Sequence, residues 1–233
     1  MPYDVVVFGA HPDDAEMGMG GTIAKLARAG HSLLIVSLTR GERGTFGDGA
    51  TRAREAAAAA AILECETRIL DFPDTRLEND LETRDAVMRL VREARPRLVF
   101  APYHTSTLGH RDGAAHVDHR QTGTLVREAL RIARLAGVEP QLPPHDVGRL
   151  LYYMVPRDRL PHVLVDVSDA METLERALQA YATQMRIERQ GNPILDVLRT
   201  FRRYYGIAAG CTYAEGFLAE EPLRADVGTL FTL

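Results

Sequence analysis

Histidine and aspartate side chains gather at two places in the sequence. The stretch AHPDDAEMG (10–18) follows an apolar run, and HVDH (116–119) comes much later in the chain. Burying carboxylates is costly unless a partner compensates their charge. We therefore interpret His11 and Asp14 as ligands of a metal ion, and Asp13 as the group that acts on water bound to that metal.

The elements that must position these side chains follow from the pattern of apolar runs. The expected strands are 4–9, 32–38, 67–72 and 97–102, and the expected helices are 18–29, 51–63 (capped by Thr51) and 82–94. Strand and helix thus alternate. This alternation predicts an α/β fold with a Rossmann-like, doubly wound, mainly parallel sheet flanked by helices on both faces.

The rest of the chain continues the pattern less regularly. We expect helices at 122–137, 169–185 and 195–209, and strands at 149–155 and 162–168. The end of the chain is otherwise expected to be irregular, with Tyr204 and Tyr205 packed in the core. No linker or repeat divides the sequence, so we predict a single domain over residues 1–233.

The two motifs are expected to meet at one edge of the sheet. In the strand order 3-2-1-4-5, the first and fourth strands are neighbours, and ligands bind at their carboxyl ends. The side chains brought together are His11, Asp13, Asp14, His116, Asp118 and His119. Two histidines and a carboxylate suit a catalytic zinc ion with an open position. A second carboxylate accepts the proton of the bound water, which predicts metal-assisted hydrolysis of an amide or ester.

Each motif also has an ordinary interpretation. Acidic residues favour the first turn of any helix, and isolated histidines are common on protein surfaces. The glycines of GMGGT (18–22) resemble a dinucleotide-binding loop, but they lack the G-x-G-x-x-G spacing. Because two aspartates stand where a pyrophosphate would lie, the sequence argues against nucleotide binding.

Composition narrows the class of protein further. The chain of 233 residues is 45% hydrophobic and 26% charged, with a net charge of −4 and a pI of about 6.1. These values argue against general attraction to nucleic acid or to anionic membranes. Only two cysteines occur, and we expect neither a signal peptide nor a membrane helix, so we predict a cytoplasmic protein.

Several segments together resemble a known family. They are AHPDDAEMGMGGTIAKLARAG, LTRGERGTFG, DFPDTRL, RLVFAPY, HVDH, AYATQM and YAEGF. In this order they resemble the zinc-dependent N-acetylglucosaminyl deacetylases of the LmbE/PIG-L type, and most nearly the bacillithiol-biosynthesis branch. The resemblance covers nearly the whole chain. It implies an N-deacetylase whose substrate is N-acetylglucosaminyl malate and whose products are glucosaminyl malate and acetate.

The resemblance also implies roles for individual residues. The implied zinc ligands are His11, Asp14 and His119. Asp13 corresponds to the general base, and His116 to the residue that assists the tetrahedral intermediate or the leaving amine. Asp118 corresponds to the carboxylate that tunes His116. A His/His/Asp set also holds iron(II), so Fe²⁺ is the alternative to Zn²⁺.

Arginines at the mouth of the site are expected because malate is anionic. The candidates for substrate binding are Arg43, Arg52 and Arg111, of which Arg52 corresponds to an arginine that contacts substrate in the family. The sequence departs from the family at Val117, where proline is usual, and at Ala115, where arginine is frequent. Arg111 or His110 is a candidate to replace that arginine.

Two other functions fit parts of the pattern. One is deacetylation of a different amidosugar, such as a thiol conjugate, an antibiotic precursor or a chitin-type fragment. The other is a non-catalytic metal-binding or nucleotide-binding protein on the same fold, which would not need Asp13 as an additional base. The family resemblance further implies a homo-oligomer, a hexamer or trimer, with the segment VGTLFTL (227–233) as a candidate contact.

Overall fold

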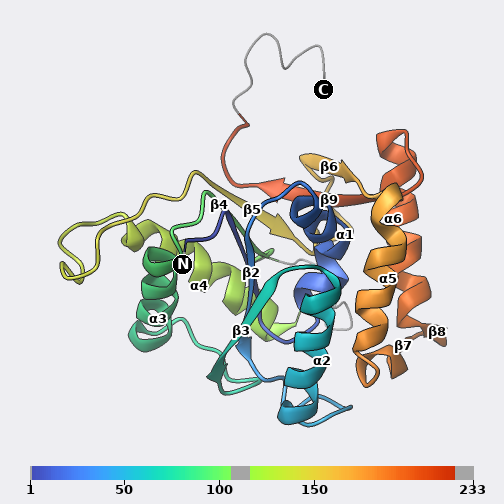
Figure 1. Cartoon of the computed structure of the whole chain (residues 1–233), viewed down its shortest axis with the longest axis horizontal. Coiled ribbons are helices and arrows are strands. Elements are labelled where there is room, and N and C mark those ends of the chain that lie inside the picture. The colour runs from blue at the N-terminus through green and yellow to red at the C-terminus, as the bar shows by residue number, and fades with distance from the viewer. Residues whose placement is uncertain (1, 106–115, 224–233) are drawn as a thin grey trace.

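A twisted sheet forms the centre of the protein (Figure 1). The computed structural model describes residues 2–105 and 116–223, and within these ranges the main sheet has seven strands in the order β3-β2-β1-β4-β5-β9-β6. Its strands are β1 (Val5–Gly9), β2 (Leu33–Thr39), β3 (Glu66–Phe72), β4 (Leu98–Pro102), β5 (Arg149–Tyr153), β6 (Val163–Asp166) and β9 (Ala214–Ala219). A separate hairpin joins β7 (Glu188–Arg189) to β8 (Asn192–Pro193).

Helices cover both faces of this sheet. They are α1 (Asp14–Arg28), α2 (Gly49–Ile62), α3 (Leu81–Ala94), α4 (Val117–Ala133), α5 (Met171–Ala180) and α6 (Ile194–Ala209), with short 3-10 turns η2 (Ser168–Ala170) and η3 (Gln184–Arg186). Figure 1 shows α1, α2 and α5 on one side of the sheet and α3 and α4 on the other. Each face has its own hydrophobic core, so the predicted sheet flanked by helices is confirmed.

The strand order that places the site is also as predicted. β3, β2, β1, β4 and β5 are neighbours in that order, and each pair is parallel. The interior strands β1 and β2 are buried along their whole length, as expected for parallel strands covered on both faces. β1 and β4 therefore end side by side, and the segments that follow them lie at the same edge of the sheet.

The far side of the sheet contains a strand that the sequence did not reveal. β9 is antiparallel to both β5 and β6, whereas this part of the chain was expected to be irregular. Its sequence AEGFLA places Glu215 and Gly216 inside the strand, which weakens the usual apolar pattern. The prediction for Tyr204 is wrong as well, because its side chain on α6 is 60% exposed.

Several helix boundaries differ from those expected, and α1 begins at Asp14 instead of residue 18. α2 begins at Gly49 and is capped by Asp48, which accepts a hydrogen bond from Thr51 N at 2.7 Å, so Thr51 is not the cap. α4 begins at Val117 instead of residue 122, which puts most of the HVDH motif in its first turn. α5 ends at Ala180 instead of residue 185, and the Tyr181 hydroxyl beyond it donates to buried Glu16 at 2.8 Å.

A kink divides α1 behind the candidate site. Met19 has non-helical angles (φ −152°, ψ 24°), so backbone groups on both sides lack helical partners. Glu215 accepts hydrogen bonds from the N–H groups of Gly21 and Thr22 at 3.0 and 2.7 Å. Arg202 donates to the Met17 carbonyl at 2.9 Å and pairs with Glu215 at 2.7 Å. This buried pair satisfies both ends of the kink.

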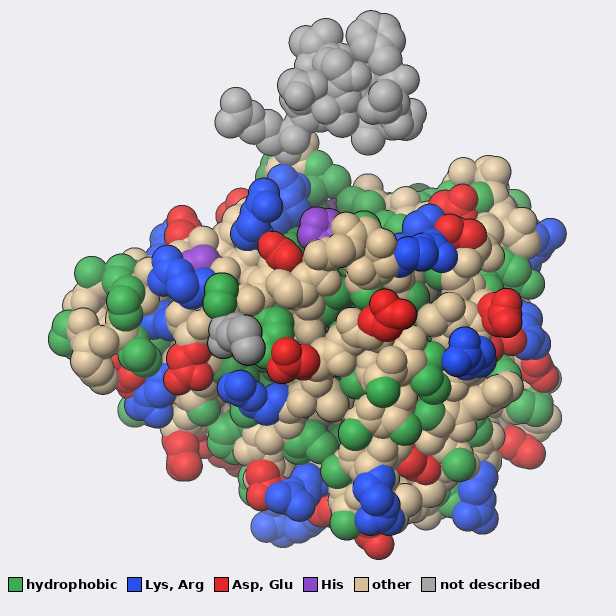
Figure 2. Space-filling view, in the orientation of Figure 1, with side chains coloured by type: hydrophobic (Ala, Val, Ile, Leu, Met, Phe, Trp, Pro, Cys, Tyr) green, Lys and Arg blue, Asp and Glu red, His purple; other side chains and the backbone are tan. Residues whose placement is uncertain are grey.

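The visible surface has no dominant charge. Figure 2 shows basic and acidic side chains interspersed over one face of the molecule. This mixture agrees with the small net charge of −4. Among the helices of the described residues, none is both long and apolar enough to cross a membrane.

Candidate metal centre and active site

The HPDD motif forms a tight turn between β1 and α1. Asp14 Oδ2 accepts hydrogen bonds from the backbone N–H groups of Ala10 and His11, at 2.8 and 2.9 Å. Gly9 allows this close approach, since a Cβ there would lie 3.0 Å from the Asp14 Cβ. Asp13 has φ 111° and makes no side-chain capping bond to α1. The turn therefore directs three polar side chains to the sheet edge without using Asp13 as a helix cap.

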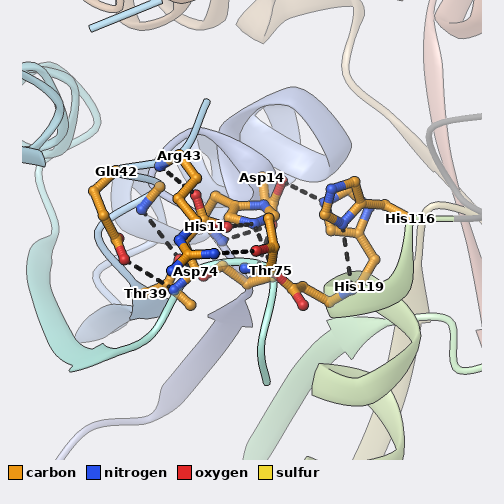
Figure 3. A network of polar contacts seen from close by, with 12 residues as sticks. His11, Asp14, Thr39, Glu42, Arg43, Asp74, Thr75, His116 and His119 are labelled. Atoms are coloured by element: carbon orange, nitrogen blue, oxygen red, sulfur yellow. Dashed lines mark hydrogen bonds and ion pairs between the residues drawn. The ribbon is translucent and has the colours of Figure 1, made fainter. Parts of the chain in front are cut away.

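Three histidines surround Asp14. His119 Nε2 lies 3.0 Å from Asp14 Oδ1, and His11 Nδ1 lies 3.5 Å from Asp14 Oδ2. Ring nitrogens of His11, His116 and His119 all lie within 4.8 Å of one another. In Figure 3, His116 and His119 lie together beside the start of α4, with Asp14 directed toward them. The topology thus brings the two sequence motifs to one point, as predicted.

The donor set fits a metal ion such as zinc. Imidazole nitrogen and carboxylate oxygen are common zinc ligands, and a catalytic site uses three protein ligands. His11, Asp14 and His119 are buried, with their donor atoms facing one another, whereas His116 is exposed at the side of the cluster. This arrangement is compatible with the expected ligands, with the more exposed His116 beside them.

Two further carboxylates stand behind His11. Asp74 Oδ1 lies 3.1 Å and Asp118 Oδ2 3.3 Å from His11 Nε2. A ligating histidine commonly donates its other ring N–H to a carboxylate, which fixes its orientation and makes it a stronger ligand. His11, Asp74 and Asp118 thus form a second group of side chains, which shares His11 with the three-histidine group. We interpret its two carboxylates as groups that hold the His11 ring in place.

This geometry corrects the expected partner of Asp118. The resemblance implied that Asp118 tunes His116, but its carboxylate reaches His11 and accepts a bond from Thr75 N at 2.7 Å. His116 instead accepts a bond from the Asp118 backbone N–H at 3.2 Å. Asp118 Oδ1 is buried and has no hydrogen-bond partner among the described residues.

Asp74 was not recognised from the sequence. It lies beyond the end of β3, two strands away from β1, so the rule for neighbouring strand ends did not point to it. Arg43 N donates to Asp74 Oδ2 at 2.8 Å, and Asp74 N donates to Glu42 at 3.0 Å. Figure 3 shows this loop–loop contact on the side of His11 away from His116. The only sequence signal was the turn segment DFPDTRL.

The three candidate arginines lie in different surroundings. Arg52 is 4% exposed and pairs with Asp13 Oδ1 at 3.1 Å. Arg43 is exposed at the wall of the cavity. Arg111 lies outside the described residues, as do His110 and Ala115. The candidate oligomer contact at 227–233 also lies outside them.

A cavity of about 790 Å³ opens over the metal centre. Its lining includes residues of the HPDD and HVDH motifs, together with Met154 and the α6 residues Val197 and Phe201. Arg157 lies over the Phe201 ring, 5.2 Å from its centroid. Tyr205, expected in the core, is half-buried and also lines the cavity. The cavity is within the size range of small-molecule sites.

The buried acids differ in their protonation behaviour. Burial raises the pKa of Asp13 above its ordinary value, and the neighbouring Arg52 charge opposes this rise. Burial also acts on Asp14, but the charges of His119 and His11 outweigh it and hold the pKa of Asp14 well below its ordinary value. Two adjacent aspartates therefore have opposite tendencies: Asp14 stays anionic as a ligand requires, and the carboxylate of Asp13 is a stronger proton acceptor than an ordinary aspartate.

The pKa of His116 is lowered as well. Its causes are the partial burial of the ring and then the charges of His119 and His11 nearby. A lowered pKa favours the neutral imidazole, which can donate a hydrogen bond and accept a proton.

Comparison with known proteins places this site in a family. The profile of the PIG-L family, described as GlcNAc-PI de-N-acetylase, matches residues 6–130. The chain is 33% identical to diacetylchitobiose deacetylase from Thermococcus kodakarensis, over 91% of this chain and 81% of that protein.

Two further similarities cover most of the chain. A 1D-myo-inositol 2-acetamido-2-deoxy-alpha-D-glucopyranoside deacetylase from Catenulispora acidiphila is 26% identical, over 80% of this chain and 81% of its own. The structure of a conserved protein from Thermus thermophilus is 33% identical and superposes with a TM-score of 0.83, covering 97% of this chain and 98% of that one. The chain is thus a hydrolase of amide bonds, and it belongs to the PIG-L family of deacetylases.

Proposed function

We propose that this protein removes the N-acetyl group from an N-acetylglucosaminyl conjugate in a zinc-dependent reaction, within a single catalytic domain. The observation that carries the proposal is the position of Asp13. It lies in the same turn as His11 and Asp14, with its carboxylate free of any capping bond. A protein that only stored a metal would have no need of an additional buried carboxylate at this place.

We assign the metal to His11, Asp14 and His119, supported by Asp74 and Asp118 behind His11. When bound, zinc supplies a Lewis acid that polarises the acetyl carbonyl and lowers the pKa of water. Fe²⁺ is the alternative occupant of the same donors.

The side chains around the metal divide the proton transfers between them. Asp13 accepts the proton of the attacking water, whose oxygen forms a bond to the acetyl carbon. His116 stabilises the charge that develops on the former carbonyl oxygen. The C–N bond then breaks, a proton from Asp13 or His116 passes to the leaving amine, and acetate and the free amino sugar are released. Both residues line the cavity beside the metal ligands.

For the substrate, we propose N-acetylglucosaminyl malate, as used in bacillithiol biosynthesis. This choice follows from the family resemblance of the sequence and from the exposed Arg43 at the cavity wall, which can pair with a malate carboxylate. A second candidate is a chitin-type disaccharide, which the 33% identity to a diacetylchitobiose deacetylase favours. The cavity of about 790 Å³ accommodates either conjugate.

Acetate release tests this proposal. Metal-stripped protein is assayed with and without zinc on N-acetylglucosaminyl malate, diacetylchitobiose and N-acetylglucosamine. We expect zinc-dependent turnover that is fastest with the malate conjugate. Preference for diacetylchitobiose would select the second candidate, and binding of zinc without turnover of any N-acetyl sugar would contradict the proposed activity.

We also propose a cytoplasmic homo-oligomer, a hexamer or trimer. Cys65 and Cys211 are both free thiols in the structure, which is compatible with a reducing compartment. Light scattering of the purified protein measures the number of subunits, and a monomer at micromolar concentration would contradict this part of the proposal.

A further inference from the structure

The exposed charges that line the cavity are mainly basic. Among the described residues, the exposed acidic and basic side chains of the lining are Arg43, Arg157, Arg186, Arg189 and Glu188. The aspartates of the lining are all buried. A cavity lined by an excess of positive charge attracts anions. Exposed arginines are common on protein surfaces, however, so charge alone does not show which of them binds a ligand.

Arg186 is distinguished by the aromatic ring against which it lies. Its Cζ is placed over the Phe46 ring, 4.6 Å from the centroid, and both residues line the cavity. Contact with a ring limits the orientations of a guanidinium and leaves the N–H groups at its edge available for other bonds. Within the part of the chain that the structure describes, no carboxylate pairs with Arg186 and no group accepts a hydrogen bond from its guanidinium.

The two segments that carry this pair are bound to each other. Gln184 is 4% exposed, and its Nε2 donates to the Phe46 carbonyl at 2.8 Å. The next residue, Gly47, has φ +79°, and a Cβ there would lie 3.0 Å from Thr183 Oγ1. Thr183 N in turn donates to Glu55 of α2 at 2.8 Å. These contacts hold the loop after β2 against η3, so the Phe46 ring and the Arg186 guanidinium are kept together.

The other exposed arginines of the cavity lack this combination. Arg43 Nη1 already donates to Thr75 Oγ1, at 3.4 Å. Arg157 lies over a ring at the longer distance of 5.2 Å. Arg189 contacts no aromatic ring within the described residues. Arg186 therefore unites a close ring contact with a guanidinium whose donors are available, and less side-chain freedom is lost when such a group binds an anion.

We propose that Arg186 is a specificity-determining residue, which binds a carboxylate on the part of the substrate beyond the N-acetyl sugar, with the Phe46 ring holding its guanidinium in place. This inference rests on the proposed deacetylase function and deepens it, because it assigns the preference for an acidic conjugate to a side chain outside the metal centre. An arginine donates two parallel hydrogen bonds to a carboxylate, a geometry that the ammonium group of lysine lacks.

The test compares zinc-loaded Arg186→Ala, Arg186→Lys and Arg189→Ala in acetate release from N-acetylglucosaminyl malate and from the neutral diacetylchitobiose. We expect KM of Arg186→Ala for the malate conjugate to rise by about 10–100-fold with kcat nearly unchanged, because hydrogen bonds to a charged group are lost. KM for diacetylchitobiose should not change. Arg186→Lys should recover only part of the loss. Arg189→Ala removes an equal charge from the same cavity, and it should raise KM for the malate conjugate by only about two- to fivefold.

Phe46→Leu keeps the arginine but removes the ring. We expect it to raise KM for the malate conjugate by less than Arg186→Ala does, and Phe46→Tyr to restore the wild-type value; an unchanged KM in Phe46→Leu would overturn the role of the ring. Three results would overturn the role of Arg186: an unchanged KM in Arg186→Ala, an equal rise of KM for both substrates, or equal effects of Arg186→Ala and Arg189→Ala.

The failure of the proposed function is distinguishable from the failure of this inference. Wild-type protein that binds zinc but releases no acetate from any N-acetyl sugar contradicts the proposed function. Calorimetric titration of the zinc-loaded protein with glucosaminyl malate and with glucosamine measures recognition of the carboxylates without turnover. Tighter binding of glucosaminyl malate that is lost in Arg186→Ala would support the inference. Equal binding of both ligands would overturn it, as would equal binding of glucosaminyl malate to wild type and Arg186→Ala, which is expected if zinc itself holds the carboxylate.

Discussion

Two groups of buried charged side chains contact α1, and they differ in how far positive charges compensate the negative ones. The front cluster, at the start of α1, consists of His11, Asp13, Asp14, Asp74, Asp118 and His119. The rear pair, at the kink of α1, consists of Arg202 and Glu215. In the rear pair each carboxylate oxygen accepts a backbone N–H, and the arginine compensates its charge. The front cluster gathers four carboxylates, and within the described residues their charged partners are Arg52 and the histidines.

The difference indicates which group supports the fold and which performs chemistry. A buried pair whose bonds are all made locks a structure, and removing one partner is costly. A buried cluster with an excess of negative charge is stabilised by a bound cation or by protonation, so it indicates a binding site. We therefore expect changes in the front cluster to affect metal binding and turnover, and changes in the rear pair to affect stability.

Zinc removal and the His119→Ala substitution should have the largest effect. We expect both to reduce acetate release to background, because the front cluster would lose the proposed cation or one of its proposed ligands. Added zinc should stabilise the wild type by about 2.7 kcal/mol at a hundred times its Kd, which calorimetry measures as a raised Tm. If added zinc left the Tm of the wild type unchanged, the front cluster would not differ from the rear pair in its need for a cation.

Asp13→Asn should separate turnover from metal binding. The amide cannot accept the proton of water, so we expect kcat to fall by about 10²–10⁴-fold. Zinc content should be unchanged, since the ligands are intact. Tm should stay equal or rise, because one of the opposing buried carboxylates has lost its charge. Near-normal kcat would exclude Asp13 as the base.

Asp74→Asn tests the carboxylates behind His11. Removing a carboxylate partner of a ligating histidine costs about 10–100-fold in metal affinity or activity. We expect a weaker zinc affinity in a competition titration with a chelator. Asp71→Asn is the matched control, because Asp71 is an acid near the same loop whose partner is Arg40, away from the histidines. Equal effects of both substitutions would show that the supporting role is not specific.

Glu215→Ala should affect the rear pair alone. It leaves Arg202 buried without its partner and two α1 N–H groups without acceptors, so we expect a loss of about 3–5 kcal/mol in the free energy of unfolding. Glu215→Gln should lose less, because a carbonyl oxygen still accepts a bond. Denaturant titration measures both. Zinc content and kcat of the folded protein should be unchanged, and a loss of zinc binding at unchanged stability would reverse the assignment.

Asp80 is exposed, and its substitution should change the Tm less than the changes described above. It caps α3 by accepting a bond from Thr83 N at 2.8 Å, and bonds to the backbone and side chain of Thr83 lower its pKa. Its stabilisation is therefore present above the ordinary aspartate pKa and is lost as the pH falls through the lowered value. We expect Asp80→Ala to lower Tm by about 2–4 °C at neutral pH. The difference in Tm between the variant and the wild type should vanish in acid. A difference in Tm that grows as the pH falls would contradict the predicted pH dependence.

Much of the fold could be read from the sequence because the signals were local. The apolar runs of β1 and β2 and the Pro residues after β3 and before β4 marked the central elements, and the doubly wound rule ordered the first five strands. β9 was not predicted, because Glu215 and Gly216 interrupt the apolar pattern of the strand. Glu215 finds its partner Arg202 only in the folded protein. The start of α4 at Val117 was not predicted, because the polar residues of HVDH are typical of a loop.

The sequence by itself determined the types and order of the chemical groups at the site. HPDD follows the first strand and HVDH the fourth, and parallel neighbours end at the same edge, so the meeting of His11, Asp14 and His119 followed from topology. Only the tertiary structure decided which nitrogen faces which carboxylate. Asp118 turns to His11, Asp74 arrives from β3, and Arg52 donates to the Pro12 carbonyl beside Asp13. These contacts depend on the packing of loops far apart in the chain, and spacing along the sequence does not encode that packing.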